Sequence, residues 1–259
     1  MKRIDLAPAA PAECLAAEET LLNRAEAGAE QAEPAEEWLL FWEPRETFVV
    51  VGYANQVAAE VNLTACEQAG VPVLRRCSGG GAIVQLPGGL NYALILRISE
   101  AGFTHTITAA NQFIMERNRM AIETMGQMTN DKTRNPKSEI PDPKITVRGH
   151  TDLCIGNLKF SGNSQRRRKH FLLFHGTLLL NCDLHRIGEL LPMPSFQPDY
   201  RAARPHADFV ANLNQPVAAV KAALAEAWNA TATGENPPLD EIQKLARGKY
   251  ATRAWNFKW

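Results

Sequence analysis

A run of glycines between two apolar stretches is the part of the sequence best suited to chemistry. Three consecutive glycines without Cβ atoms let a ligand approach the main chain, and the exposed N–H groups of such a loop can bind an anion. Two arginines before the glycines add donors that suit phosphate or carboxylate. The run therefore predicts an anion site. Its members are Arg75, Arg76, Ser78, Gly79, Gly80, Gly81 and Ala82.

Three more segments carry polar side chains at predicted turns or strand ends. Gly52–Gln56 is a glycine turn with two amides, 148–165 includes the pattern Lys-x-Ser-Gly-x-x-Gln, and 175–180 reads His-Gly-Thr-Leu-Leu-Leu. Together with Asn91, which follows Gly-Gly-Leu, these segments supply the remaining candidate site residues. These candidates are Asn91, Asp152, Lys159, Ser161, Gly162, His175, Gly176 and Thr177.

Hydrophobic periodicity predicts the elements that position these residues. Strands and helices mix without strict β-α-β alternation, so we expect an α+β fold with a mixed, largely antiparallel sheet flanked by helices. A surface loop is expected at 128–145 and an acidic loop at 28–37. Strands are expected at 48–52, 90–97, 151–155, 158–161 and 171–180, and helices at 13–26, 62–70, 103–125, 183–191, 215–230 and 238–247.

Composition is that of an ordinary enzyme. The chain has 259 residues, 45% hydrophobic, and zero formal net charge, so no global field draws it toward nucleic acid or membrane. No window reaches the roughly 18 apolar residues of a membrane span. The five cysteines are odd in number and widely spaced, which favours a reducing cytoplasm over a disulfide framework or a zinc site. The basic tract at 166–170 is too short and isolated to indicate nucleic-acid binding. It is read either as a solvated turn or as a surface for pyrophosphate or an acidic partner domain.

Taken in this order and spacing, the motifs resemble the lipoate–protein ligase A family of the biotin/lipoate ligase superfamily. The segments that carry the resemblance are Arg-Arg-x-Ser-Gly-Gly-Gly, Lys-x-Ser-Gly-x-x-Gln and His-Gly-Thr-Leu-Leu, and it runs from about Leu15 to Phe257. It implies the fold of that family's catalytic domain, here a single domain over 1–259. It also implies an ATP- and Mg²⁺-dependent enzyme that activates lipoate as lipoyl-AMP. The acceptor would be a lysine of a lipoyl-accepting domain of the 2-oxoacid dehydrogenase or glycine cleavage type.

The resemblance makes Lys159 the principal catalytic residue. Joining a carboxylate to the α-phosphate of ATP brings two anions together, and a fixed ammonium offsets their repulsion. Arg75 takes the position that the family uses for the adenylate, and Arg76 is expected on the opposite side of the strand. Other interpretations remain open for each residue. Either arginine could instead form a surface salt bridge, and Asn91 could instead cap a turn. Asp152 could be a structural acceptor, and His175 a core histidine.

Four departures from the family pattern stand out. Tyr53 and Gln85–Leu86 replace an arginine and a His-Asp pair, and the loop at 128–145 is longer than usual. The sequence also stops where many relatives continue into a small accessory domain. We therefore expect a separate accessory subunit to complete transfer.

Three alternatives accompany this interpretation. One is an octanoyl- or lipoyl-transferase of the same fold, which would need an exposed cysteine nucleophile. Cys77, Cys154 and Cys182 are the candidates, none at the expected position. Another is a non-catalytic module that binds lipoyl carriers. Biotin ligation is disfavoured because the lysine and His-Gly-Thr motifs follow the lipoate branch.

Overall fold

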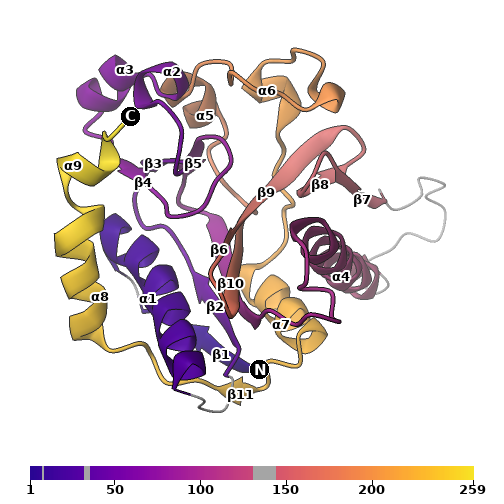
Figure 1. Cartoon of the computed structure of the whole chain (residues 1–259). Coiled ribbons are helices and arrows are strands. Elements are labelled where there is room, and N and C mark those ends of the chain that lie inside the picture. Colours follow the sequence, from indigo (N-terminus) through magenta and orange to yellow (C-terminus); the bar gives the residue numbers. More distant parts are fainter. Residues whose placement is uncertain (8, 32–35, 131–143) are drawn as a thin grey trace.

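An eight-stranded mixed sheet forms the centre of the molecule (Figure 1). The computed structural model describes residues 1–7, 9–31, 36–130 and 144–259, with the backbone alone for 126–130. Only the edge pairs of β1 with β11 and β2 are parallel within this sheet, which confirms the predicted largely antiparallel α+β fold. Its order is β11 (Ala232–Thr233), β1 (Lys2–Asp5), β2 (Trp38–Trp42), β6 (Gly89–Arg97), β10 (Phe171–Leu179), β9 (Leu158–Arg167), β8 (Asp152–Ile155) and β7 (Ile145–Arg148).

A second, three-stranded sheet carries the glycine run. Its central strand β3 (Phe48–Val51) pairs parallel with β4 (Val73–Arg75) and antiparallel with β5 (Ile83–Gln85). The glycines lie between β4 and β5, so the loop projects from one end of this sheet. This placement follows from the sequence, because the apolar residues on both sides can enter strands while the glycines cannot fill a core.

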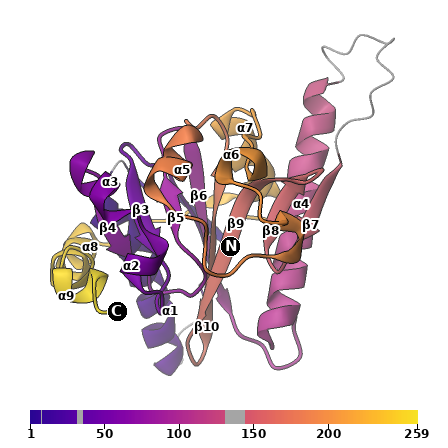
Figure 2. The ribbon, with the colours of Figure 1, turned by 90° about the horizontal axis from the view of Figure 1, so that it is seen from above.

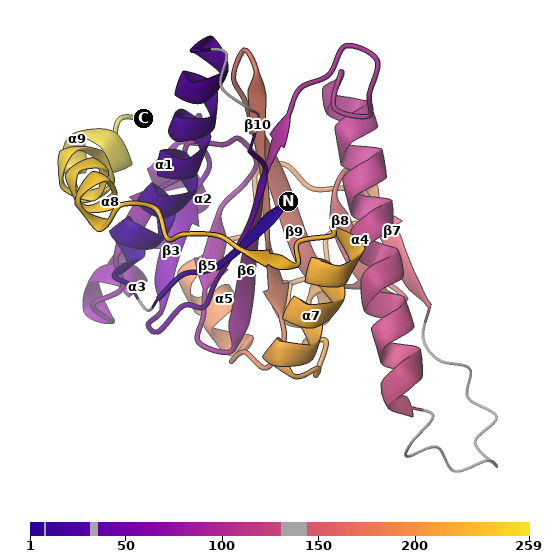
Figure 3. The ribbon, with the colours of Figure 1, turned by 90° about the horizontal axis from the view of Figure 1, so that it is seen from below.

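Helices cover both faces of the large sheet (Figures 2 and 3). One face packs against α1, with α8 packed on the outer side of α1, and the other face packs against α4 and α7. Alternation along β2 sends Leu40 and Trp42 toward α1 and Leu39 and Phe41 toward α4. The helices are α1 (Pro11–Glu30), α2 (Val57–Glu60), α3 (Leu63–Gln68), α4 (Ile107–Asn130), α5 (His185–Leu190), η1 (Asp199–Arg201), α6 (His206–Phe209), α7 (Val217–Ala227), α8 (Leu239–Leu245), η2 (Ala246–Tyr250) and α9 (Arg253–Asn256).

The sequence-based elements agree with the structure except at their ends. At the predicted helix 62–70, the Asn62 side chain accepts from the Ala65 N–H, and Gly70 has a φ of +62°. The acidic loop expected from residue 28 is wrong at its start, because α1 continues to Glu30. Alanine and glutamate favour the helix there and outweigh the cost of one glycine. Most of the loop expected at 128–145 lies outside the described residues, while 128–130 belong to α4 and Ile145 begins β7.

Candidate active site

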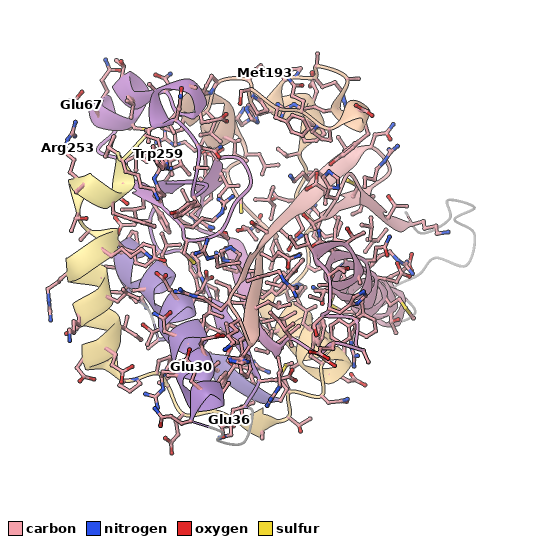
Figure 4. All side chains as sticks on the ribbon, viewed as in Figure 1. Glu30, Glu36, Glu67, Met193, Arg253 and Trp259 are labelled. Carbon is pink, nitrogen blue, oxygen red and sulfur yellow. The ribbon has the colours of Figure 1, made fainter. Side chains whose placement is uncertain are left out.

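A cavity of about 1160 Å³ lies where β8, β9 and β10 meet the glycine loop (79–81) and the wall segment (residues 192–210). The wall segment follows α5 and includes η1 and α6, and Met193 marks it near the upper edge of Figure 4. Every predicted site residue lines this cavity except Arg75 and Ser78. Those that do are Arg76, Gly79, Gly80, Gly81, Ala82, Asn91, Asp152, Lys159, Ser161, Gly162, His175, Gly176 and Thr177.

The glycine loop is held by its carbonyl groups. The Arg76 guanidinium donates to the carbonyl oxygens of Gly79 at 2.6 Å and Gly81 at 2.8 Å, and Ser164 Oγ donates to Gly79 at 2.9 Å. Among the described residues, none of the three glycine N–H groups donates a hydrogen bond. The glycine carbonyls thus point toward the Arg76 cation, while the N–H groups have no partner among these residues. Such a set of open N–H groups suits an anion.

Arg76 is buried at the base of this loop, as a charged group that bonds to neutral oxygens. Burial lowers the pKa of its guanidinium to about 10, far enough above neutrality for the charge to persist. Arg76 also donates through Nε to Ser78 Oγ at 3.0 Å. A permanent positive charge under an open set of N–H groups strengthens the preference for a negatively charged ligand.

Lys159 lies on β9 with its ammonium held over Asp152. Lys159 Nζ lies 2.8 Å from Asp152 Oδ1, and Tyr200 OH donates to Asp152 Oδ2 at 2.6 Å. Gly162 makes room for the lysine, since an added Cβ there would lie 2.9 Å from Nζ. Burial, then the charge of Asp152, raises the pKa of Tyr200 above its ordinary value, so its hydroxyl stays a donor at neutral pH. The lysine is thus oriented by a carboxylate that is itself fixed by the wall segment.

His175 connects the glycine loop to the first helix. Its Nε2 lies 2.6 Å from Ser78 Oγ, and its Nδ1 lies 2.6 Å from Glu18 Oε2. Glu18 also accepts from Trp42 Nε1 at 2.8 Å. A neutral imidazole with its proton on Nδ1 satisfies each donor, since Ser78 then accepts from Arg76 and donates to Nε2. This buried series of hydrogen bonds joins Ser78, next to the glycine loop, to α1 and β2. His175 is therefore buried, but its partners are side chains and not a backbone carbonyl.

The amide expected at Asn91 belongs to a buried network. Asn91 and Gln85 exchange two side-chain hydrogen bonds of 2.8 and 2.9 Å, and Thr177 Oγ1 donates to Asn91 Oδ1 at 2.6 Å. The alternative of a turn cap is therefore wrong for Asn91. Gly176, next to Thr177 in β10, must lack a side chain, because an added Cβ would lie 1.6 Å from Asn163 Oδ1.

Of the two predicted site residues outside the cavity lining, Ser78 contacts Arg76 and His175, whereas Arg75 lies elsewhere. Its side chain is fully buried and faces away from the cavity, toward the turn after β3 and the last helix. Adjacent residues at a strand end point to opposite faces, as expected, but the faces are the reverse of the prediction. Arg76 faces the cavity, and Arg75 is no surface salt bridge either, because all three guanidinium nitrogens donate to backbone carbonyls.

The cavity is long enough for an extended ligand. Ser164 of β9 lies opposite His175 in the sheet register, and Lys159 is five residues further along β9. At about 3.3 Å per strand residue, the Cα atoms of Lys159 and Ser164 are about 16 Å apart along β9. The Lys159 side chain reaches back along the strand to Gly162. The lining between and around Lys159 and Ser164 includes apolar side chains, among them Leu15, Val50 and Ile107.

Comparison with known proteins identifies the family. Residues 10–230 match the lipoyl protein ligase A/B catalytic domain. The chain belongs to the lipoyl protein ligase A/B family. This confirms the resemblance drawn from the motifs.

Members of this family with both kinds of activity are similar to the chain. Lipoate–protein ligase 1 of Staphylococcus aureus is 29% identical over 86% of the chain, which spans 65% of that ligase. The octanoyltransferase LipM of Geobacillus kaustophilus is 25% identical over 80% of the chain and 82% of its own length. The bi-partite lipoate protein ligase of Thermoplasma acidophilum has the same fold, with a TM-score of 0.74 at 20% identity over 99% of this chain and 95% of that one. The chain is therefore an enzyme of the lipoate ligase and octanoyltransferase family. No helix of the described residues is long and apolar enough to cross a membrane.

The cysteines matter in this family because its transferases would need a reactive thiol. All five cysteines are buried. Burial raises the pKa of Cys77 to about 12, and it also raises the pKa of Cys154 and Cys182. Cys154 lies opposite Lys159 in the register and is fully buried, with its Sγ 3.6 Å from Tyr200 OH. A protonated, inaccessible thiol is a poor nucleophile.

Glu18, Trp42 and Tyr200 take part in the hydrogen bonds that hold predicted site residues in place, but they were not among the candidates of the sequence analysis. Glu18 belongs to an acidic pair on the apolar face of the first predicted helix, and an acid at a buried helical position was a usable signal. Trp42 lies in an apolar run with no polar marker. Tyr200 lies in the wall segment, where no periodic pattern exists to predict its direction.

Proposed function

We propose that this protein is an ATP-dependent lipoate–protein ligase that forms lipoyl-AMP and transfers the lipoyl group to a lysine of a lipoyl-accepting domain. The observation that supports it most is one cavity that contains both the Lys159 ammonium and a glycine loop with open N–H groups. A carboxylate and a polyphosphate are both anions, and this arrangement offers separate positive partners to each. The solved structures of the same fold include a T. acidophilum protein with bound lipoic acid and a lipoate–protein ligase A with bound ATP.

In the first half-reaction a lipoate oxygen attacks the α-phosphate, and pyrophosphate leaves. The Lys159 ammonium would lie between the two reacting anions and stabilise the charge that develops in the transition state. The glycine N–H groups would bind phosphate oxygens, with Arg76 holding the loop open for them. Preorganised donors of this kind need no rearrangement during the reaction, which is why the fixed contacts of Asp152 and Arg76 matter.

The apolar part of the cavity suits the lipoyl chain. Each buried methylene contributes about 0.8 kcal/mol, so several give a few kcal/mol of binding. Polar groups would face only the carboxylate end. We assign the remaining predicted contacts, Asn91, Ser161, Gly162, Gly176 and Thr177, to the walls that orient the acyl chain and adenylate.

Mg²⁺ would enter with the nucleotide. Among the described residues there is no group of three or more His, Cys, Asp or Glu side chains that could hold a metal ion. Asp152 is the carboxylate nearest Lys159, but both of its oxygens already have partners. Mg²⁺ commonly binds through substrate phosphates and one or two carboxylates. The residues present therefore fit a nucleotide-borne ion better than a resident one.

In the second half-reaction the acceptor lysine attacks the mixed anhydride, and AMP leaves. A mixed anhydride must be shielded from water until that lysine arrives. We propose that a separate small subunit supplies part of this shielding, supported by the two-part ligase of T. acidophilum, whose structure was reported with its E2 lipoyl domain. Transfer measured with and without such a subunit tests this, and full rates for the chain alone would discard it.

Substitution of the cysteines distinguishes this proposal from the transferase alternative, which the similarity to LipM supports. We expect Cys77→Ser, Cys154→Ala and Cys182→Ser each to keep at least about half of the wild-type turnover, because these buried thiols with raised pKa do not carry the acyl group. Cys154→Ala should lower stability through the cavity it leaves. The measurement is lipoyl-AMP formation together with thermal unfolding. Complete loss in a folded variant, with an acyl thioester trapped on that cysteine in the wild type, would establish the transferase instead.

Tyr200→Phe tests whether the wall segment orients the lysine. Hydrogen bonds to charged groups contribute about 1.5–3 kcal/mol, so loss of the bond to Asp152 should lower kcat for adenylation about 10-fold. The melting temperature should fall by no more than about 10 °C, because the bond is lost but the ring keeps its packing against Phe209 and Arg148. A kcat equal to that of the wild type would remove Tyr200 from the account.

Lipoate-dependent exchange of pyrophosphate into ATP tests the proposed function as a whole. The purified chain with Mg²⁺, ATP and lipoate should incorporate labelled pyrophosphate into ATP, and omission of lipoate should abolish this. Absence of exchange, together with acyl transfer from a thioester donor, would show the transferase reaction.

A further inference from the structure

The turn after β3 (residues 52–55) supports the glycine loop from outside the cavity. An added Cβ on Gly52 would lie 1.9 Å from the carbonyl oxygen of Gly80, so the two backbones are in direct contact. The Tyr53 N–H donates to the Ser78 carbonyl at 2.8 Å. Any displacement of this turn must therefore move the glycine loop or break these contacts.

Arg75 holds that turn. Its Nη1 donates to the carbonyl oxygens of Gly52 at 2.8 Å, Tyr53 at 3.1 Å and Asn55 at 2.8 Å. Among the described residues, no carboxylate lies within salt-bridge distance of this buried guanidinium. The Arg75 guanidinium therefore stabilises the positions of these backbone carbonyls, because a buried donor without a partner costs free energy.

The other side of Arg75 holds the end of the chain. Nε donates to the Trp255 carbonyl at 3.2 Å and Nη2 to the Asn256 carbonyl at 3.0 Å. The bonds are reciprocal, since Trp255 Nε1 donates to the Arg75 carbonyl at 2.8 Å and Asn256 Oδ1 accepts from the Arg75 N–H at 3.0 Å. Helix α9 thus packs beside β4, as Figure 1 shows.

We infer that Arg75, Trp255 and Asn256 form a positioning latch, through which the last helix sets the glycine loop that binds the phosphates of ATP. The latch passes from α9 to the turn at 52–55 and from there to Gly80 and Ser78. Its members are positioning residues, because none of them lines the cavity. The ATP part of this inference rests on the proposed function, whereas the structural coupling does not.

The test uses Arg75→Lys and Trp255→Phe, with Arg253→Ala as the matched control. The lysine ammonium cannot bond to five carbonyls at once, and phenylalanine keeps an aromatic ring but lacks the indole N–H that bonds to Arg75. Arg253 belongs to the same helix but is exposed on its outer side, as Figure 4 shows, and its guanidinium contacts the Phe257 ring. Amide NMR spectra of the full-length protein report on Gly79, Gly80 and Gly81 without any assay of activity.

We expect Arg75→Lys to shift the amide resonances of all three glycines and to raise KM for ATP at least about 10-fold, with kcat at saturating ATP within about threefold. Trp255→Phe should do the same to a smaller extent, and Arg253→Ala should do neither. Trp255→Phe decides the question if Arg75→Lys does not fold. Glycine resonances that stay unchanged in a folded variant would overturn the latch. An unchanged KM for ATP would overturn its positioning role. Failure of the wild type to bind ATP would instead count against the proposed function, and the NMR result would still decide the latch.

Discussion

Replacing Lys159 with alanine should reduce lipoyl-AMP formation at least about 100-fold, while the protein stays folded. The ammonium is the charge that offsets repulsion between lipoate and the α-phosphate, so its loss acts on the transition state more than on binding. Stability should change by no more than about 1 kcal/mol, because the ion pair with Asp152 is partly exposed to solvent. Single-turnover formation of lipoyl-AMP, with thermal unfolding in parallel, measures both effects.

Two further variants sharpen this test. Lys159→Arg should also fail, because Gly162 leaves room for a compact ammonium and not for a planar guanidinium. Lys244→Ala removes an exposed lysine on α8, far from the cavity lining, and should keep full activity. Near wild-type turnover by Lys159→Ala would remove the lysine from its catalytic role.

Substituting alanine for Gly81 should lower kcat/KM for ATP about 100-fold without destabilising the protein. An added Cβ at Gly81 meets no protein atom within 4 Å, so the folded chain tolerates it. Alanine should even raise the free energy of unfolding slightly, by restricting the unfolded chain. The methyl group would occupy space that we assign to the ligand, and this is the physical reason for a glycine there.

Gly248→Ala is the matched control for this prediction. Gly248 lies in η2, outside the cavity lining, and an added Cβ there also meets no atom within 4 Å. Both variants should fold equally well, and only Gly81→Ala should lose ATP affinity in a titration. Equal ATP affinity in the two would mean that no ligand approaches the glycine loop closely.

The sequence allowed most of the fold to be predicted, because its signals are local. The cap at Asn62, the glycine stop at Gly70 and the apolar runs of β3, β6 and β10 each depend on neighbours along the chain. The glycine loop and the lysine motif could likewise be placed in one site through the resemblance. Strand β2 gave no clear prediction, since a short apolar run suits a strand or a buried helix equally.

The sequence does not predict the direction of a side chain whose hydrogen-bond partner is distant along the chain. Strand alternation predicts that Arg75 and Arg76 point to opposite faces, but the choice between faces depends on α9, 180 residues away along the chain. In the same way Glu18 reaches His175 across 157 residues, and Tyr200 reaches Asp152 across 48. These long-range bonds decide which polar residues bind ligand and which hold the backbone.

Mass spectrometry of a lipoyl domain tests the central claim most directly. The domain is incubated with the purified chain in three reactions: lipoate with ATP and Mg²⁺, lipoate without ATP, and octanoyl carrier protein without ATP. An accessory subunit is added in a parallel set. We expect the mass of a lipoyl group on one lysine in the first reaction and none in the other two. Octanoylation from the carrier protein, with no modification by lipoate and ATP in either set, would contradict the account and identify a transferase.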